Sequence, residues 1–109
     1  MATHDFLTGL PNRALLNERI QQAMAQARRR DEVLALLYVD IDNFKAVNDT
    51  FGHGEGDRYL VDMARRLSSS VRQGDTVLRV GGDEFTVVAE GVHSDQEALE
   101  LASRIVESA

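Results

Sequence analysis

The sequence predicts one small α+β domain, in which helices pack on a mostly antiparallel sheet. Three stretches carry apolar residues at helical spacing, and a short apolar run at residues 33–39 is typical of a strand. Two β-type runs flank the pair Gly81-Gly82, as in a β-hairpin. The order along the 109 residues is helix, strand, helix, hairpin, helix, and we expect the helices to cover one face of the sheet. Three strands make a narrow sheet, so we expect further strands in the intact domain.

Composition and charge narrow the class of protein. Hydrophobic residues make up 43% of the chain and charged residues 28%, as in ordinary globular domains. The formal net charge of -6 argues against a nucleic-acid partner, because proteins that bind nucleic acid neutralise its phosphates with a basic face. The sequence has no cysteine, no signal peptide and no apolar run of the ~18 residues that span a membrane. We expect a cytoplasmic domain; a membrane anchor elsewhere in a full-length protein would be compatible with it.

The first helix is expected to begin near Pro11 or Asn12, with Asn12 as its N-cap. Three arginines, residues 28–30, close it; cations at the negative end of a helix dipole are the simpler interpretation, and a binding patch is the alternative. The strand that follows is bounded by charges and nearly continuously apolar. We therefore expect it to be buried on both faces and central in the sheet. The inner positions of the first helix are Leu15, Leu16, Ile20, Met24 and Ala27.

The middle of the chain is predicted to form a polar loop over residues 43–57, which contains three glycines. A second helix should cover about residues 56–71, and residues 72–75 should form a turn. Its inner stripe is Leu60, Met63, Ala64, Leu67 and Val71. Ser94-Asp95-Gln96-Glu97 matches a capping box and predicts the start of a last helix. The apolar residues of that helix are Leu99, Leu101, Ile105 and Val106.

The hairpin turn is the first feature that suggests chemistry. Both central residues of a type I′ turn need φ > 0, and Gly81-Gly82 would satisfy this. Asp83 and Glu84 follow at once, although acidic residues have low strand propensity, so a plain hairpin gains little from them. A glycine turn also lets a ligand approach the backbone closely. We therefore expect a nucleotide and a metal ion to meet at this turn.

A second pair of acids, Asp40 and Asp42, stands at the end of the first strand, with both side chains on the same side. Acids there commonly cap a turn, and that interpretation stays open. If the strand pairs with the hairpin, however, Asp40 and Asp83 arrive at one edge of the sheet. Converging carboxylates raise each other's pKa unless a cation lies between them. Such oxygen ligands suit Mg²⁺ (or Mn²⁺) bound together with substrate phosphates, as in polymerases and nucleases.

The loop after Asp40 contains residue types suited to a nucleotide. Backbone N–H groups and the Lys45 ammonium could hold a terminal phosphate, and a solvated surface lysine is the alternative. Asn48 can donate and accept, and Asp57 can accept from the N1–H and N2–H₂ groups of guanine; both residue types are also common in turns and helix caps. His53 could touch a ribose, whereas a single histidine without other His or Cys is a weak candidate for a metal ligand.

Three separated stretches of the sequence match one protein family in the same order. They are Asp5-x-Leu7-Thr8-Gly9-Leu10-Pro11-Asn12-Arg13, Asp40-Ile41-Asp42-x-Phe44-Lys45-x-Val47-Asn48-Asp49-x-Phe51-Gly52-His53-x-x-Gly56-Asp57 and Arg79-x-Gly81-Gly82-Asp83-Glu84-Phe85. With these stretches the sequence resembles the GGDEF family of diguanylate cyclases. The last stretch alone would only be suggestive, and the three together make the resemblance specific. It extends from Asp5 to about Ala89 and fades in the last helix.

The resemblance implies a fold similar to the palm of class III nucleotide cyclases and polymerases. It implies that two GTP condense into cyclic di-GMP with release of two pyrophosphates, in a homodimer whose domains each bind one GTP. Asp40, the backbone carbonyl of Ile41 and Asp83 would hold divalent metals, and Asp83, with Glu84 close by, would be the base for the ribose 3′-hydroxyl. The implied GTP contacts are Asn43, Phe44 and Lys45 at the phosphates, where Lys45 would stabilise transition-state charge, Asn48 and Asp57 at guanine, His53 near the sugar, and Leu7, Phe44 and Leu60 around the base.

Arg72 and Asp75 lie where many members of this family carry an Arg-x-x-Asp site for inhibition by the product. Arginine can clamp a phosphate and stack on guanine, and aspartate can accept from a guanine edge. The alternative is a surface ion pair worth ~0–1 kcal/mol. Because position and residue types both match, we favour the inhibitory site, with Arg104 as a candidate second arginine.

Three functions are compatible with the sequence. The leading one is synthesis of cyclic di-GMP. The first rival is a module that binds GTP without turnover and regulates an attached cyclic di-GMP phosphodiesterase; sensor domains would fit either. The second rival is a product receptor that acts through Arg72 and Asp75 alone. The family's domain continues through a further strand, a helix and basic residues that contact phosphates. We therefore expect residues 1–109 to be a single domain incomplete at its C-terminus, with little or no turnover in isolation.

Overall fold

The computed structural model describes residues 2–41 and 44–108. Its elements are, in order, α1 (Arg13–Arg30), β1 (Val33–Asp40), α2 (Phe44–Phe51), α3 (His53–Ser70), β2 (Thr76–Arg79), β3 (Glu84–Val92) and α4 (Asp95–Ser108). The strands form one antiparallel sheet in the order β1-β3-β2. This confirms the predicted α+β class and antiparallel sheet. Within the described part of the chain, no helix has the length and apolar character that crossing a membrane requires.

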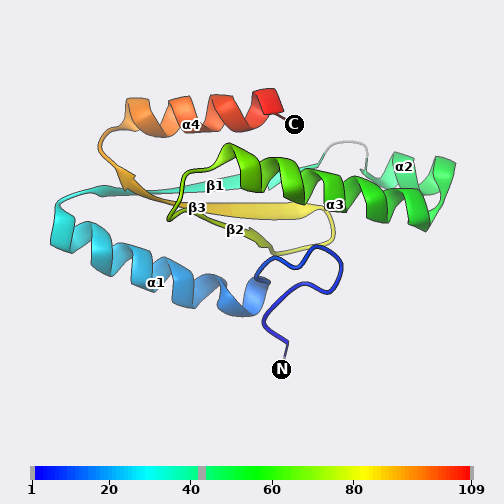
Figure 1. Cartoon of the computed structure of the whole chain (residues 1–109), viewed down its shortest axis with the longest axis horizontal. Coiled ribbons are helices and arrows are strands. Elements are labelled where there is room, and N and C mark those ends of the chain that lie inside the picture. Colours follow the sequence, from blue (N-terminus) through cyan, green and yellow to red (C-terminus); the bar gives the residue numbers. More distant parts are fainter. Residues whose placement is uncertain (1, 42–43, 109) are drawn as a thin grey trace.

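Helices cover both faces of the sheet, so the prediction of one covered face was wrong (Figure 1). α1 lies on one side, where Ala23 packs with Leu78 and Val88. α3 and α4 lie on the other side, over Phe85 and Val87. The reason is the strand period of two: successive side chains of β3 point to opposite faces, and both sets are buried. A sheet that is apolar on both sides needs two helical layers.

β3, rather than β1, is the central strand of the described sheet. Its two edges pair with β1 and with β2. β1 lies at an edge, and Val33 and Tyr38 on it are 44% and 75% exposed. The prediction that β1 is buried on both faces was wrong, because all of its residues are exposed or half-buried. Its apolar side chains do pack against the core clusters on the two sides of the sheet. The apolar run could not indicate pairing, because the number of neighbours of a strand is not encoded in its own side-chain pattern.

The predicted polar loop is mostly helical. α2 occupies eight of its residues, and α3 begins at His53 rather than near Gly56. Gly52, with φ 88°, breaks the chain direction between the two helices, and its N–H donates to the Asn48 carbonyl at 2.8 Å. Gly56 lies inside α3, and a larger residue would not fit there, because the Asn48 side chain occupies the space that a Cβ would need. These glycines therefore allow a helix break and a close helix contact, not a flexible loop.

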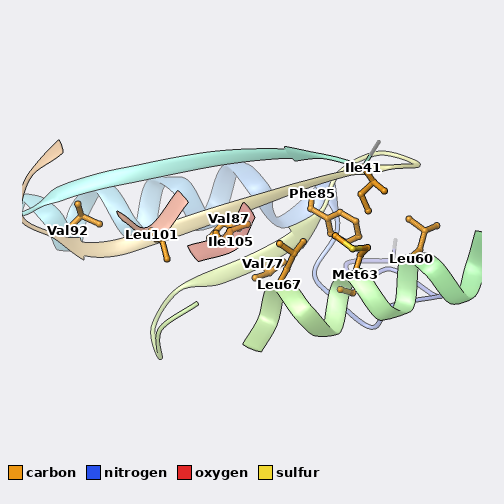
Figure 2. Close-up of a cluster of buried hydrophobic side chains, with 12 residues drawn as sticks. Ile41, Leu60, Met63, Leu67, Val77, Phe85, Val87, Val92, Leu101 and Ile105 are labelled. Atoms are coloured by element: carbon orange, nitrogen blue, oxygen red, sulfur yellow. The ribbon is translucent and has the colours of Figure 1, made fainter. Parts of the chain in front are cut away.

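The main core lies between the sheet and the helices α3 and α4 (Figure 2). Phe85, the first buried residue after the hairpin turn, is 1% exposed, and its ring lies near Met63 of α3. Leu67 of α3 and Leu101 of α4 belong to the same cluster. Phe85 thereby anchors the turn to the core, since a large aromatic side chain contributes roughly 1.5–3 kcal/mol when fully buried.

The helix ends agree with most of the local signals. Asn12 caps α1, and its side chain accepts from the Ala14 N–H at 2.9 Å. Ala23, and not Met24, is the buried residue of α1; Met24 is 40% exposed. Only half of the predicted capping box forms at α4, where Ser94 Oγ accepts from the Glu97 N–H at 3.1 Å. The Glu97 carboxylate is engaged elsewhere, as described below.

Thr86 is the buried polar residue of β3, and its hydroxyl is 0% exposed without a hydrogen-bond partner among the described residues. Thr86→Val keeps the shape and removes that hydroxyl, so it should raise the free energy of unfolding by about 1 kcal/mol in chemical denaturation. Thr86→Ser is the matched control. It keeps the hydroxyl and loses a methyl, and it should lower the free energy of unfolding by about 1 kcal/mol. A valine variant no more stable than wild type would contradict the assignment.

Candidate functional site

The pairing of β1 with β3 brings three acids together at one end of the sheet. Asp40 lies directly opposite Glu84, and the Ile41 N–H donates to the Asp83 carbonyl at 3.0 Å. One carboxylate oxygen from each of Asp40, Asp83 and Glu84 lies within 4.8 Å of the other two. Asp40 and Glu84 are exposed and Asp83 is half-buried. Sequence reasoning anticipated that Asp40 and Asp83 converge, and the structure adds Glu84 as an equal member of the cluster.

The hairpin turn that carries Asp83 is not of type I′, and that prediction was wrong. Four residues, 80–83, connect β2 to β3, and neither Gly81 nor Gly82 is among the glycines with positive φ. The N–H groups of Val80 and Gly81 both donate to the Glu84 carbonyl, at 3.0 and 3.3 Å. A four-residue connection does not need the two left-handed residues that a two-residue loop requires. Gly81 instead leaves room for the Glu84 side chain, which a Cβ there would approach to 3.1 Å.

Arg79 organises this turn from the last position of β2. Its guanidinium donates to the carbonyl oxygens of Gly81 and Gly82, at 3.2 and 2.7 Å. It also donates to both carboxylate oxygens of Asp5, at 2.9 and 3.1 Å. The side chains of Arg79 and Asp5 are only 15% and 18% exposed. Asp5 and Arg79 belong to the sequence motifs that indicate the family, but the motifs gave neither residue a role. The two residues are 74 positions apart, so no local pattern predicts their contact.

Asp5 also closes the N-terminal turn, since its carboxylate accepts from the Thr8 N–H at 2.8 Å and from the Thr8 hydroxyl at 2.7 Å. Burial opposes ionisation of Asp5, but the hydrogen bonds from Thr8 and Arg79 outweigh it and hold the pKa of Asp5 below its ordinary value of 3.8. The N-terminal segment is therefore tied to the hairpin turn by one ionised carboxylate. Figure 1 shows this segment beside the turn, at the end of the sheet where α2 and α3 begin.

A pocket of ≈ 360 Å³ lies beside this N-terminal segment, between it and α3. It brings together Leu7 and Asp57, two residues predicted to contact guanine. Asn48 packs on Gly56, next to Asp57, and its Oδ1 is buried without a partner among the residues that the structure describes. The pocket is lined by Leu7, Asp57, Arg58, Val61, Asp62 and Arg65.

The remaining predicted GTP contacts occupy different environments. Lys45 is exposed in the first turn of α2, where backbone N–H groups have no partner within the helix. Phe44 packs against the main core, and His53 is exposed at the start of α3. Leu60 is 1% exposed and belongs to the core rather than to the pocket lining. Asn43 lies outside the described residues.

Arg72 and Asp75 lie at the opposite end of the sheet, in the predicted turn before β2. The Asp75 carboxylate is 1% exposed and accepts from the N–H groups of Arg72 and Glu90, both at 3.1 Å. The Arg72 guanidinium donates to the Glu90 carbonyl at 3.0 Å and to the Glu97 carboxylate at 2.8 Å. Sequence reasoning missed Glu97, whose only signal was its place in the capping box. Arg104 is exposed on α4.

Comparison with known proteins identifies the same family as the sequence motifs. A family model described as diguanylate cyclase, GGDEF domain, matches residues 2–109. The bifunctional diguanylate cyclase/cyclic di-GMP phosphodiesterase MucR of Pseudomonas aeruginosa is 47% identical over 97% of this chain. The chain spans only 15% of MucR.

Solved structures of related proteins share the fold. The GGDEF domain of TpbB (YfiN) from Pseudomonas aeruginosa has a TM-score of 0.91 and 44% identity, over 96% of this chain and 61% of that one. The GGDEF domain of DgcB from Caulobacter crescentus, in complex with c-di-GMP, has a TM-score of 0.85 and 30% identity, with the same coverage. These structures confirm the predicted cyclase-like architecture.

The link between Asp5 and Arg79 generates a pH-dependent prediction. Because the folded pKa of Asp5 is depressed, its carboxylate stabilises the fold above pH 3.8, and this stability is lost as pH falls through the folded pKa. Asp5→Asn should lower the free energy of unfolding at pH 7 by roughly 1–3 kcal/mol, since it removes a hydrogen-bonded charge. The difference in the free energy of unfolding between wild type and Asp5→Asn should become smaller below pH 3.8. Urea denaturation at several pH values measures this difference, and one that stays constant with pH would contradict the role of the charge.

Proposed function

The chain belongs to the GGDEF family of diguanylate cyclase domains, and on this premise we propose that it is the domain that condenses two GTP into cyclic di-GMP. The observation that carries the proposal is the cluster of Asp40, Asp83 and Glu84, with carboxylate oxygens within 4.8 Å of one another. No ion pair joins these acids to a cation among the described residues. Such a cluster is costly unless a cation neutralises it, and phosphoryl transfer requires one.

The donor set of this cluster fits Mg²⁺ or Mn²⁺. All three side chains offer hard carboxylate oxygens, and the exposure of Asp40 and Glu84 leaves space for water and phosphate oxygens. We propose that Asp40, Asp83 and the carbonyl of Ile41 hold the metal, with Glu84 beside them. When bound, the ion would supply charge neutralisation at the phosphates and a lowered pKa for a coordinated hydroxyl.

The chain's own groups would then act on two GTP molecules. The Asp83 carboxylate accepts the proton from the 3′-hydroxyl of one GTP. The 3′-oxygen forms a bond to the α-phosphorus of the other, and the bond from that phosphorus to the bridging oxygen breaks, so that pyrophosphate leaves. Repetition with the roles exchanged closes the ring and releases the second pyrophosphate. Lys45 and the first turn of α2 bind the phosphates, where a positive charge and N–H groups without a partner inside the helix favour an anion.

Guanine recognition is proposed at the pocket that contains Leu7 and Asp57. The position of Asn48 supports this, because it packs on Gly56, next to Asp57 of the pocket, and an amide can both donate to and accept from guanine. Asp57 accepts from the N1–H and N2–H₂ edge, while Leu7 and Phe44 contact the base and Leu60 supports it from the core. His53 would contact the sugar, and Asn43, which lies outside the described residues, would contact the phosphates. One domain holds one GTP, so we propose a homodimer as the catalytic unit.

Asp83→Ala should abolish metal-dependent turnover in the full-length protein, because it removes both a ligand and the proposed base. Formation of cyclic di-GMP from GTP and Mg²⁺ measures this, and loss of about 10²-fold or more is expected for a general base. Asp95→Ala, which removes an exposed carboxylate at the other end of the sheet, is the control and should retain activity. If Asp83→Ala forms product at the wild-type rate, its assigned role is wrong. If wild type binds GTP without forming product, the regulatory module attached to a phosphodiesterase is the better description.

We also propose that Arg72 and Asp75 bind cyclic di-GMP and inhibit synthesis, with Arg104 as the second arginine. A complex of the related DgcB with c-di-GMP supports the ligand class. Arg72→Ala should retain GTP turnover and relieve inhibition, so that added cyclic di-GMP no longer slows pyrophosphate release. Arg19→Ala is the control, because it removes the same charge from an exposed position on α1, away from the proposed site. Inhibition at an unchanged concentration would leave Arg72 and Asp75 with a structural role alone.

A further inference from the structure

The guanidinium of Arg72 is already occupied by protein oxygens. Nη1 donates to Glu97 Oε1 at 2.8 Å, and Nη2 donates to the Glu90 carbonyl at 3.0 Å. Nε lies 3.6 Å from Asp75 Oδ2. An arginine binds a carboxylate or a phosphate through the same N–H groups. These oxygens take up to three of the five N–H groups of the guanidinium. An anionic ligand can therefore engage those N–H groups only after one of these partners has moved away.

Glu97 is the partner that can move. Asp75 is 1% exposed and receives two backbone N–H groups, so it is held in the turn. Glu90 contributes a backbone carbonyl of the central strand, which the sheet holds in place. Glu97 contributes a side chain that is 31% exposed, on the first turn of α4, and rotation about its side-chain bonds would carry it into water.

A second set of contacts holds the Glu97 carboxylate near Arg72. Its Oε2 accepts from the His93 N–H at 3.2 Å and lies 3.2 Å from His93 Nδ1. The other ring nitrogen of His93 lies 3.1 Å from Glu32 Oε2, just before β1. The hydrogen bond from Arg72, followed by that from the His93 backbone, lowers the pKa of Glu97, so the carboxylate is ionised at neutral pH. Glu97 is thus an anion positioned on the guanidinium.

We propose that Glu97 is an internal competitor for Arg72, which cyclic di-GMP must displace in order to bind. The inference rests on the proposed inhibitory role of Arg72 and adds a residue that sets the product concentration at which inhibition begins. The apparent dissociation constant equals the intrinsic one divided by the fraction of molecules in which Arg72 is released. Glu97 lowers that fraction, and so it delays inhibition.

Titration of the full-length protein with cyclic di-GMP in a calorimeter tests the competition. Glu97→Gln keeps an acceptor for the His93 N–H and removes the charge that holds Arg72. Because charge-assisted hydrogen bonds are about twice as strong as neutral ones, we expect the dissociation constant to fall about threefold to tenfold. Glu100→Gln is the matched control. It removes the same charge from the same helix, at a side chain whose described contact is Gln96, and it should leave the affinity unchanged.

Arg72→Ala, alone and combined with Glu97→Gln, separates the competition from the inhibitory site itself. If Arg72→Ala abolishes binding and Glu97→Gln leaves the affinity unchanged or weaker, the site stands and the competition is wrong. If Arg72→Ala binds like wild type, or if no variant binds, the proposed site fails and the competition fails with it. A gain that persists in the double variant, or one that Glu100→Gln reproduces, shows that Glu97 does not act through Arg72.

Glu97→Asp covers the case in which the glutamine variant loses its fold. The aspartate keeps the charge and shortens the reach by one methylene, so it withdraws the carboxylate from Arg72. It should also tighten binding of cyclic di-GMP, while its thermal unfolding stays cooperative. A folded aspartate variant with wild-type or weaker affinity overturns the proposal.

Discussion

The register between β1 and β3 is the constraint on which the site depends. It sets Asp40 opposite Glu84 and allows the Ile41 N–H to bond the Asp83 carbonyl. A slip of one residue would turn every side chain of β1 to the other face, because strand side chains alternate. It would also separate the three acids. The packing of apolar residues on the two faces of the sheet fixes this register, and the register places the three acids together.

The turn that presents Asp83 is stabilised from outside the hairpin. Arg79 joins two carbonyls of the turn to Asp5, a residue of the N-terminal segment. Phe85 anchors the other side of the turn in the core. The acids themselves are left exposed or half-buried. This arrangement gives a rigid support to side chains that have no cation of their own among the described residues, as a metal-dependent site would need.

The two ends of β3 differ in whether the carboxylates near them are paired with a cation. At the Glu84 end, carboxylates converge without a cation in the described part of the chain. At the Glu90 end, about 20 Å away for six residues of extended strand, Asp75 and Glu97 are both paired with the Arg72 guanidinium. The first end suits a ligand that brings its own cation, and the second suits a ligand that competes for an arginine. The two ends of one acidic domain thereby differ in their electrostatic environment.

Local signals in the sequence determined the elements: the Asn12 cap, the apolar stripe of α3, the strand at residues 33–39 and the acids beside Gly82 all depend on neighbours within a few positions. The three motifs also determined the family. Tertiary structure alone decided that β3 is central, that helices cover both faces and that a four-residue turn replaces the predicted one. It also decided the partners of Asp5 and Glu97. Those partners, Arg79 and Arg72, lie 74 and 25 positions away along the chain, and such contacts arise from packing, which no local spacing of residues encodes.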